Sequence, residues 1–256
     1  MTKLNWTGWT VLAVLALAWE CAARFYPPVQ VYVPPLTQVF TSLLRIAAGG
    51  EIGGHLLTTV SRFATGYLIA SLLAVTAGVV LGYFPFAYSL AHVLIEFLRP
   101  MPSVAIIPVA ILLLGLTDAM IVAVTVYASV WPALVNTIDG VRNIDPVLVQ
   151  TGRTFGLGWA RVLWKVVLPA ASPQIVTGLR ISLAIALILV TTAEMLAASK
   201  GLGFFVLDEE RSLRNDRMYA GIVLVALLGY VLNRVFVAAA DKALRWRRGV
   251  AARQGF

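Results

Sequence analysis

Few residues of this chain could carry out covalent chemistry, and they are scattered along the sequence. There are two histidines, His55 and His92, and one cysteine, Cys21. A metal site needs several converging ligands, and a thiolate site needs more than one cysteine. No GxxxxGK[ST] nucleotide loop, HExxH metal site or GxSxG nucleophile motif occurs. The sequence therefore predicts no catalytic residue, and no metal or cofactor bound by this chain.

The polar residues that could act on a solute lie within or beside apolar runs. Glu194 is near the end of one such run, and an ionisable residue inside a membrane span is a functional candidate. A packing role, with a hydrogen bond to a neighbouring span, is the alternative. Glu96 and Arg99 are three residues apart and share a helix face, so a local ion pair and a solute contact are both open. The candidate path residues are Arg99, Met101, Ser103, Thr191, Thr192 and Glu194.

The composition is that of an integral membrane protein. Hydrophobic residues make up 60% of the 256 residues and charged residues 12%, and the mean hydropathy is +0.87. A soluble domain has about 25% charged residues. The net charge of +8 is better explained by basic residues at membrane ends than by nucleic-acid binding. The chain is expected to lie in a lipid bilayer and to bind no nucleic acid.

The apolar runs predict six spanning helices, since each span needs about 20 residues. An extended, proline-rich external loop and a short amphipathic helix over Leu36–Ala48 follow the first of them. The third run contains Pro100, Pro102 and Pro108, so it is expected to be a broken helix beside a pathway. The predicted spans are Gly8–Arg24, Leu56–Phe84, Leu90–Leu116, Ala119–Ile138, Pro173–Ala198 and Met218–Ala240.

Basic residues indicate the orientation. With six spans both termini share one side, which collects Lys3, the basic residues of the 139–172 loop and those of the tail. The positive-inside rule places this side in the cytoplasm, although the basic residues of the 200–217 loop weaken the bias. A polar stretch from Asp145 to Pro169 then lies in the cytoplasm. It reads as a short helix, a turn at Gly156 and Gly158, and a second helix.

The chain resembles the permease subunits of ATP-binding-cassette (ABC) importers, the binding-protein-dependent transport family. The family's cytoplasmic loop has the pattern EAA, three residues, glycine, a spacer, and an aliphatic residue with proline. Gly156 and Leu168-Pro169 fit this spacing, while Gln150, Thr151 and Gly152 stand where EAA is usual. The runs LGWARVLWKVVLPAASPQIVTGLR (157–180) and AEMLAASKGLG (193–203) are also family-like. The resemblance covers about residues 56–245 and is greatest to the sulfonate, nitrate and taurine subgroup.

The resemblance implies an all-α membrane protein with the type I ABC importer permease fold and a coupling helix near Val147–Phe155. That helix would be capped near Asp145-Pro146 and stopped by a glycine with positive φ. Gln150 removes the usual negative charge, and Arg153 offers a compensating polar contact. The implied ATPase-contacting residues are Val147, Leu148, Gln150, Thr151, Gly152, Arg153, Phe155, Gly156 and Leu157.

The implied function is a non-enzymatic permease subunit that forms the translocation pathway for a small solute, such as a sulfonate, taurine or nitrate. Its implied partners are a second copy of itself, two cytoplasmic ATPases that hold ATP and Mg, and a periplasmic or lipid-anchored substrate-binding protein. It would lie in the bacterial inner membrane. The expected parts are residues 1–55 with the first span and amphipathic helix, a core over 56–245, and a basic tail over 246–256.

The main alternative is a gradient-driven secondary transporter or channel without an ATPase. That class would show an internal repeat and paired broken helices, and the sequence has only the one interrupted span. The substrate stays open, because these subunits often leave selection to the binding protein. Bicarbonate, an aromatic acid and a thiamine precursor are further alternatives.

Overall fold

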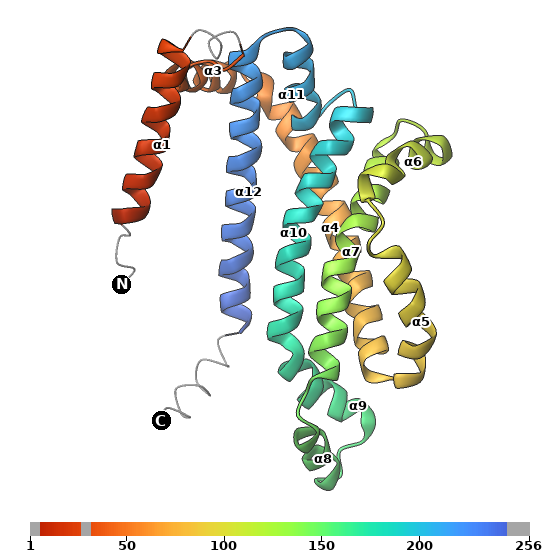
Figure 1. Ribbon diagram of the computed structural model, residues 1–256. Coiled ribbons are helices and arrows are strands. Elements are labelled where there is room, and N and C mark those ends of the chain that lie inside the picture. The colour runs from red at the N-terminus through yellow and green to blue at the C-terminus, as the bar shows by residue number, and fades with distance from the viewer. Residues whose placement is uncertain (1–5, 27–31, 245–256) are drawn as a thin grey trace. The chain divides into compact units, whose positions relative to one another are not determined.

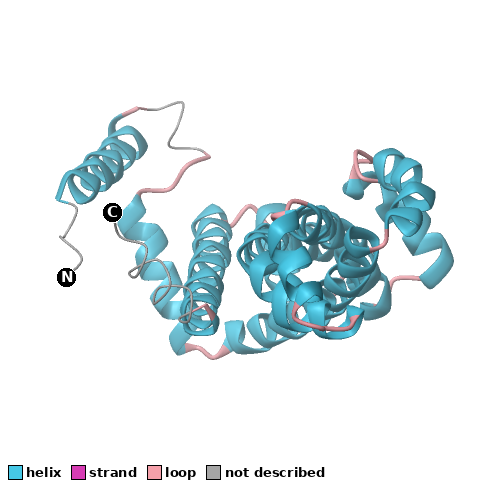
Figure 2. Ribbon diagram, turned by 90° about the horizontal axis from the view of Figure 1, so that it is seen from below, coloured by secondary structure: helices cyan, strands magenta, loops and turns pink. Residues whose placement is uncertain are grey.

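A computed structural model describes residues 6–26 and 32–244, which are helices joined by loops and contain no strand (Figure 2). Lys3, part of the proline-rich loop and the tail after residue 244 lie outside the described residues. The helices before the third run are α1 (Trp6–Phe25), α3 (Leu36–Ala48) and α4 (Glu51–Tyr83). α5 (Pro85–Leu98), η1 (Ser103–Ile106), α6 (Ile107–Leu114) and α7 (Asp118–Arg142) come next. The remainder are α8 (Pro146–Thr154), α9 (Trp159–Val162), η2 (Leu163–Val167), α10 (Leu168–Ala197), α11 (Leu202–Arg211) and α12 (Asn215–Ala243).

The chain divides into two compact units. The first comprises residues up to Thr59 and residues Glu194–Leu227. In it, the Trp19 indole N–H of α1 donates to the Pro34 carbonyl (3.1 Å). The Thr37 backbone N–H donates to Glu20 (3.1 Å). Within the amphipathic helix α3, Val39, Ser42 and Ile46 are buried. These bonds fix the ends of α1 and α3, and α3 has the bounds predicted from its apolar spacing.

The second unit comprises residues 60–193 and 228–256. One of its core patches joins α4, α5 and α7 through residues such as Ala74, Ile95 and Leu134. Another joins α4, α10 and α12 around Phe63, Leu187 and Val190. α8 and α9 lie at one end of α7 and α10 (Figure 1). This unit therefore holds the predicted coupling loop at the end of a packed helical core.

Within the described residues, four stretches are long and apolar enough to cross a membrane, namely Glu51–Tyr83, Asp118–Arg142, Trp159–Ala197 and Asn215–Ala243. The pair Pro85–Leu98 and Ser103–Leu114 makes a fifth if it is one span, and its two parts are bent by 87°. The break in the third run, predicted from its prolines, is thereby confirmed. The first predicted span falls on α1, which has 20 residues and exposed leucines but is not among these stretches.

Two predicted boundaries differ from the structure. The fifth span was expected to begin at Pro173, yet the helix is continuous from Trp159 and Pro173 lies inside α10. Proline breaks a helix only where the missing N–H and the ring clash are not accommodated. A π-helical turn at Leu163–Val167 precedes α10. The external polar loop over Lys200–Arg217 contains the helix α11, with Leu202, Phe205, Val206 and Glu209 buried.

Glycines allow α4, α7 and α10 to pack closely. A Cβ on Gly178 would lie 2.6 Å from the Asn136 Cβ, 3.0 Å from the Pro132 carbonyl oxygen and 3.1 Å from the Ala133 Cα. Two of these neighbours are backbone atoms, which cannot swing away. Small residues that let helix backbones approach are typical of membrane helix contacts. Gly178 is therefore required by the contact between α10 and α7.

We expect Gly178→Ala to destabilise the permease by about 1–3 kcal/mol, the usual cost of overpacking a tight core. Gly54→Ala is the matched control, because nothing lies within 4 Å of its Cβ position in α4. That substitution should be neutral or stabilise by about 0.5–1 kcal/mol. Thermal unfolding of both variants in the same detergent measures the difference. Equal melting temperatures for the two would contradict the packing described for Gly178.

Candidate functional site

The helix α8 is capped at both ends. At its start the Asp145 side chain accepts a hydrogen bond from the Val147 N–H (2.8 Å), and Pro146 is the first helical residue. At its end the Gly156 N–H donates to the Arg153 carbonyl (2.9 Å), and the Leu157 N–H donates to the Gly152 carbonyl (3.1 Å). Gly156 has φ +76°. This pair of bonds is a Schellman motif, so the predicted aspartate cap and glycine stop are confirmed.

Caps and packing make this nine-residue helix stable although helices shorter than about 12 residues are marginal alone. Gly152 is buried, and a Cβ there would lie 3.5–3.7 Å from Val166, Val162 and Leu157. Val162 and Val167 belong to a core patch with Val141 and Ala171, against which Leu157 packs. α8 is thus a short rigid helix held on the ends of α7 and α10.

The predicted coupling residues fall on different faces of α8. Val147, Leu148 and Phe155 are 62%, 49% and 81% exposed, and Thr151 is also exposed. Gly152 and Leu157 face the body of the protein. Gln150 and Arg153 are also exposed, and they line a cavity. Apart from Gly152 and Leu157, these residues are therefore accessible from outside, and Val147, Leu148 and Phe155 give α8 an apolar outer face.

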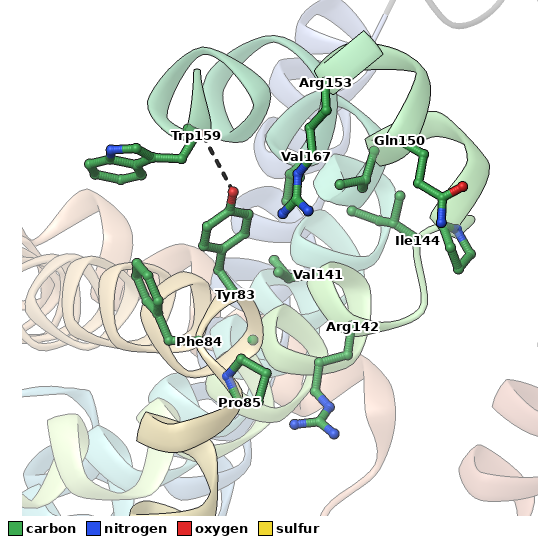
Figure 3. Close-up of a pocket in the computed structure, with 13 residues that line it drawn as sticks. Tyr83, Phe84, Pro85, Val141, Arg142, Ile144, Gln150, Arg153, Trp159 and Val167 are labelled. Atoms are coloured by element: carbon green, nitrogen blue, oxygen red, sulfur yellow. Dashed lines mark hydrogen bonds between the residues drawn. The ribbon is translucent and has the colours of Figure 1, made fainter. Parts of the chain in front are cut away.

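A cavity of about 670 Å³ lies beside α8 (Figure 3). The Arg153 guanidinium points into it, and Arg142 lies beside Pro85 (Figure 3). The Tyr83 hydroxyl donates to the Trp159 carbonyl (3.4 Å) across one side. The residues that line it are Gly82, Tyr83, Phe84, Pro85, Val141, Arg142, Ile144, Pro146, Val149, Gln150, Arg153, Trp159 and Val167.

Two of the predicted path residues, Arg99 and Ser103, lie together in a second cavity of about 360 Å³. The break between α5 and η1 brings them there, and the Leu98 carbonyl accepts a hydrogen bond from the Tyr127 hydroxyl (3.0 Å). Met101, between them, is partly exposed and is not part of the lining. The other lining residues are Ala128, Trp131, Pro132, Val135, Asn136, Ile181 and Ile185. Glu96 contacts His92 (3.4 Å), not Arg99.

Sequence reasoning missed Trp131 and Asn136 as part of this cavity. Asn136 donates to the Pro132 carbonyl (2.8 Å) and accepts from the Gln174 amide (3.0 Å), which orients its side chain. The signal was present, because Asn136 is an amide near the end of an otherwise apolar span. Its spacing from Arg99 gave no indication that a bent helix brings them together.

The remaining path candidates lie elsewhere. The Thr191 and Thr192 hydroxyls donate to backbone carbonyls of their own helix, Leu187 (2.9 Å) and Ile188 (2.8 Å). Glu194 belongs to the first unit, is fully buried and does not line either cavity. Of the six path candidates, the structure therefore brings Arg99 and Ser103 into one cavity.

Glu194 is the centre of a buried polar cluster. The Thr59 hydroxyl lies 2.8 Å and 3.0 Å from its two carboxylate oxygens, and the Gly203 N–H donates to it (3.0 Å). The Leu202 N–H donates to the Thr59 Oγ1 (2.7 Å). Gly201 has φ +124°, and a Cβ there would lie 2.3 Å from the Glu194 carboxyl carbon. These contacts are those expected of a packing role, which was one of the two interpretations of Glu194.

A second buried carboxylate in the first unit, Glu209 of α11, is paired with arginines. It lies 2.6 Å from Arg214 and 3.0 Å from Arg217, and Arg217 also contacts Glu51 (2.7 Å). Burial raises the pKa of Glu209 above its ordinary value, although the Arg217 and Arg214 charges act to lower it. This network ties α11 to the starts of α4 and α12.

Comparisons with known proteins agree on one family. Residues 66–245 match the model of the binding-protein-dependent transport system inner membrane component. The chain is 30% identical to the taurine transport system permease of Escherichia coli K12, over 87% of this chain and 82% of that one. It is 26% identical to a Bacillus subtilis permease named for aliphatic sulfonate transport, over 94% and 87%.

The structure also resembles a solved ABC transporter. A chain of the MetNI methionine ABC transporter, in an inward-facing conformation, matches with a TM-score of 0.61 and 19% identity. The match covers 76% of this chain and 94% of that chain. At this identity the likeness bears on the fold alone, and it confirms the predicted permease fold.

Proposed function

The chain belongs to the binding-protein-dependent transport system inner membrane components, and on this premise we propose that it forms the pathway for a small anion and is driven by ATPase subunits that grip α8. Membership makes it a multi-pass inner-membrane permease subunit of an ABC importer, a subunit type that is not itself catalytic. The family implies an ATPase and a substrate-binding protein as partners.

The observation that carries the ATPase contact is the outer face of α8. A short helix that is capped at both ends and packed on the core is rigid. Val147, Leu148 and Phe155 nevertheless leave apolar surface exposed at its tip. Exposed apolar groups on a polar connection are typical of a protein contact. A rigid helix transmits movement of a partner to α7 and α10, which the coupling role requires.

Co-purification with the ATPase tests this contact. Val147→Asp with Leu148→Asp places two charges on the outer face and should remove most of the bound ATPase. The matched control is Arg161→Asp with Lys165→Asp, two exposed positions of the same loop that are not on α8. Undiminished ATPase binding by the first double variant would contradict the proposed docking face.

The cavity with Arg99 and Ser103 is proposed as part of the pathway. Arg99 is exposed, and among the described residues its guanidinium makes no hydrogen bond or ion pair. A cation beside a polar hydroxyl and amide in a cavity between membrane helices suits an anion. The names of the taurine and sulfonate relatives support a sulfonate-type substrate. Ser103 and Asn136 would add uncharged contacts.

We expect Arg99→Gln to lower uptake of the anionic substrate about tenfold, because a charge-assisted hydrogen bond contributes about 1.5–3 kcal/mol. Arg99→Lys, which keeps the charge but not the forked geometry, should fall between this variant and the original protein. Uptake of radiolabelled taurine into proteoliposomes is the measurement, with bound ATPase quantified in the same sample. Normal uptake by Arg99→Gln would remove Arg99 from the pathway.

The assembly is proposed as a homodimer of permease chains, each holding one ATPase through its α8. Two identical halves around a two-fold axis suit a pathway between them. The termini and α8 are assigned to the cytoplasm on the positive-inside rule. The segments over residues 26–55 and 200–217, which the same rule assigns to the outside, would then meet the substrate-binding protein. Mixed charges on α11, such as Asp208, Glu210 and Arg211, suit a reversible contact.

A further inference from the structure

The lining of the cavity beside α8 carries positive charge and no negative charge. Its lining includes two arginines, and none of its 13 lining residues is an aspartate or glutamate. The Arg142 guanidinium is stacked on the Tyr88 ring, 3.9 Å from the ring centroid. Arg153 is exposed, and among residues 6–26 and 32–244 its guanidinium makes no hydrogen bond or ion pair. It points into the cavity (Figure 3).

Aromatic and aliphatic side chains form the rest of the wall. Tyr83, Phe84 and Pro85 come from the junction of two apolar helices, α4 and α5. Phe84 is 44% exposed and Trp159 is 65% exposed. Tryptophan and other aromatic residues are typical of the level at which a membrane meets water. The cavity therefore combines an apolar wall at the end of membrane helices with a cationic floor.

We propose that this cavity binds the phosphate headgroup of an anionic phospholipid from the cytoplasmic leaflet of the membrane, with Arg153 as its main contact. Guanidinium groups match phosphate oxygens in geometry and charge. Basic pockets between membrane helices on the cytoplasmic side bind anionic headgroups. The volume of about 670 Å³ is within the range of small-molecule sites. The apolar wall would contact the first carbons of the lipid's acyl chain. A free phosphate ion would leave this wall uncovered.

The cavity is separate from the apolar face of α8 that is proposed to bind the ATPase, and it includes Gln150 and Arg153, for which the family resemblance also implied ATPase contacts. Pro146, Val149, Gln150 and Arg153 recur at helical spacing on its side of α8, whereas Val147 and Leu148 project from the other side. A lipid and the ATPase therefore bind opposite sides of one short helix. The assignment of the lipid to the cytoplasmic leaflet, and of the lipid and the ATPase to opposite sides of α8, rests on the proposed function. The lipid would then fix the resting position of α8.

Native mass spectrometry of the intact permease and ATPase complex tests the proposal. The complex, purified in detergent, is titrated with phosphatidylglycerol and, separately, with zwitterionic phosphatidylethanolamine. The expected result is retention of phosphatidylglycerol by the original complex and roughly tenfold weaker retention by Arg153→Gln. Arg142→Gln, the second arginine of the cavity, should also weaken it. Arg161→Gln is the matched control, an exposed arginine of the same loop outside the lining, and should retain the lipid.

Three results would overturn the proposal. An equal loss of lipid retention in Arg161→Gln would mean that diffuse surface charge holds the lipid and that the cavity is not a specific site. Displacement of the lipid by millimolar inorganic phosphate would identify a free-anion site. Lipid bound to the permease alone but absent from every complex that retains the ATPase would mean that the partner fills the cavity. The same spectrum shows whether the ATPase is present, so its loss counts against the proposed function and leaves the lipid measurement on the permease intact.

Discussion

Glu194→Ala is expected to destabilise the permease by about 2–6 kcal/mol. The substitution leaves two buried donors, the Thr59 hydroxyl and the Gly203 N–H, without the carboxylate that they contact. An orphaned buried donor costs about 1–3 kcal/mol. Glu194 is fully buried, so water does not replace the lost acceptor without rearrangement. Thermal unfolding of the purified protein in detergent, together with its yield in the membrane, measures the effect.

Two further variants distinguish the loss of these buried hydrogen bonds from a general effect of removing a negative charge. Glu194→Gln keeps one acceptor oxygen and the side-chain shape, so it should recover much of the stability. Glu210→Ala removes an exposed carboxylate nearby on α11 and should change the free energy of unfolding by less than about 0.5 kcal/mol. A melting temperature for Glu194→Ala equal to that of Glu210→Ala would contradict the structural role.

Gly156→Val is expected to reduce the ATPase bound to the permease by about five- to thirtyfold. A side chain at φ +76° costs about 1–2 kcal/mol in the left-handed region, and a β-branched one is the least tolerated. A cost of this size changes an equilibrium by about 5–30-fold. The strain acts on the Schellman motif that ends α8, so the helix loses its fixed end. Co-purification of the ATPase is the measurement.

Gly158→Val is the control for this prediction. Both glycines have open space around a Cβ, with nothing within 4 Å, but Gly158 has φ −64° and ψ 162°, which valine adopts readily. The two variants therefore differ in backbone strain and not in size. Similar ATPase binding by both would show that the cap of α8 is not needed for docking.

Much of the fold was predictable because membrane-spanning helices appear in a sequence as long apolar runs. α3 matches its predicted bounds, and the prolines between Arg99 and Pro108 indicated the broken span. The helix α11 was missed, since its polar residues resemble a loop. Its buried positions, Leu202, Phe205, Val206 and Glu209, nevertheless recur at helical spacing. The charged residues on the exposed face led to the prediction of a polar loop.

The site was predictable only where the signal is local. The aspartate cap and the glycine stop of α8 depend on neighbouring residues and could be read directly. The division of α8 into an outer face and a cavity face depends on how α4 and α7 end beside it. The pairing of Thr59 with Glu194 joins residues 135 positions apart. No periodicity in the sequence carries such a contact.

Import through this chain is proposed to be driven by an ATPase bound to α8. The most direct measurement is accumulation of labelled taurine in proteoliposomes that contain the permease, the ATPase and the substrate-binding protein. ATP and Mg on the ATPase side should drive accumulation, and the double substitution Val147→Asp and Leu148→Asp should abolish it while the permease remains folded. Accumulation driven by an ion gradient without ATP, or undiminished by that double substitution, would contradict the account.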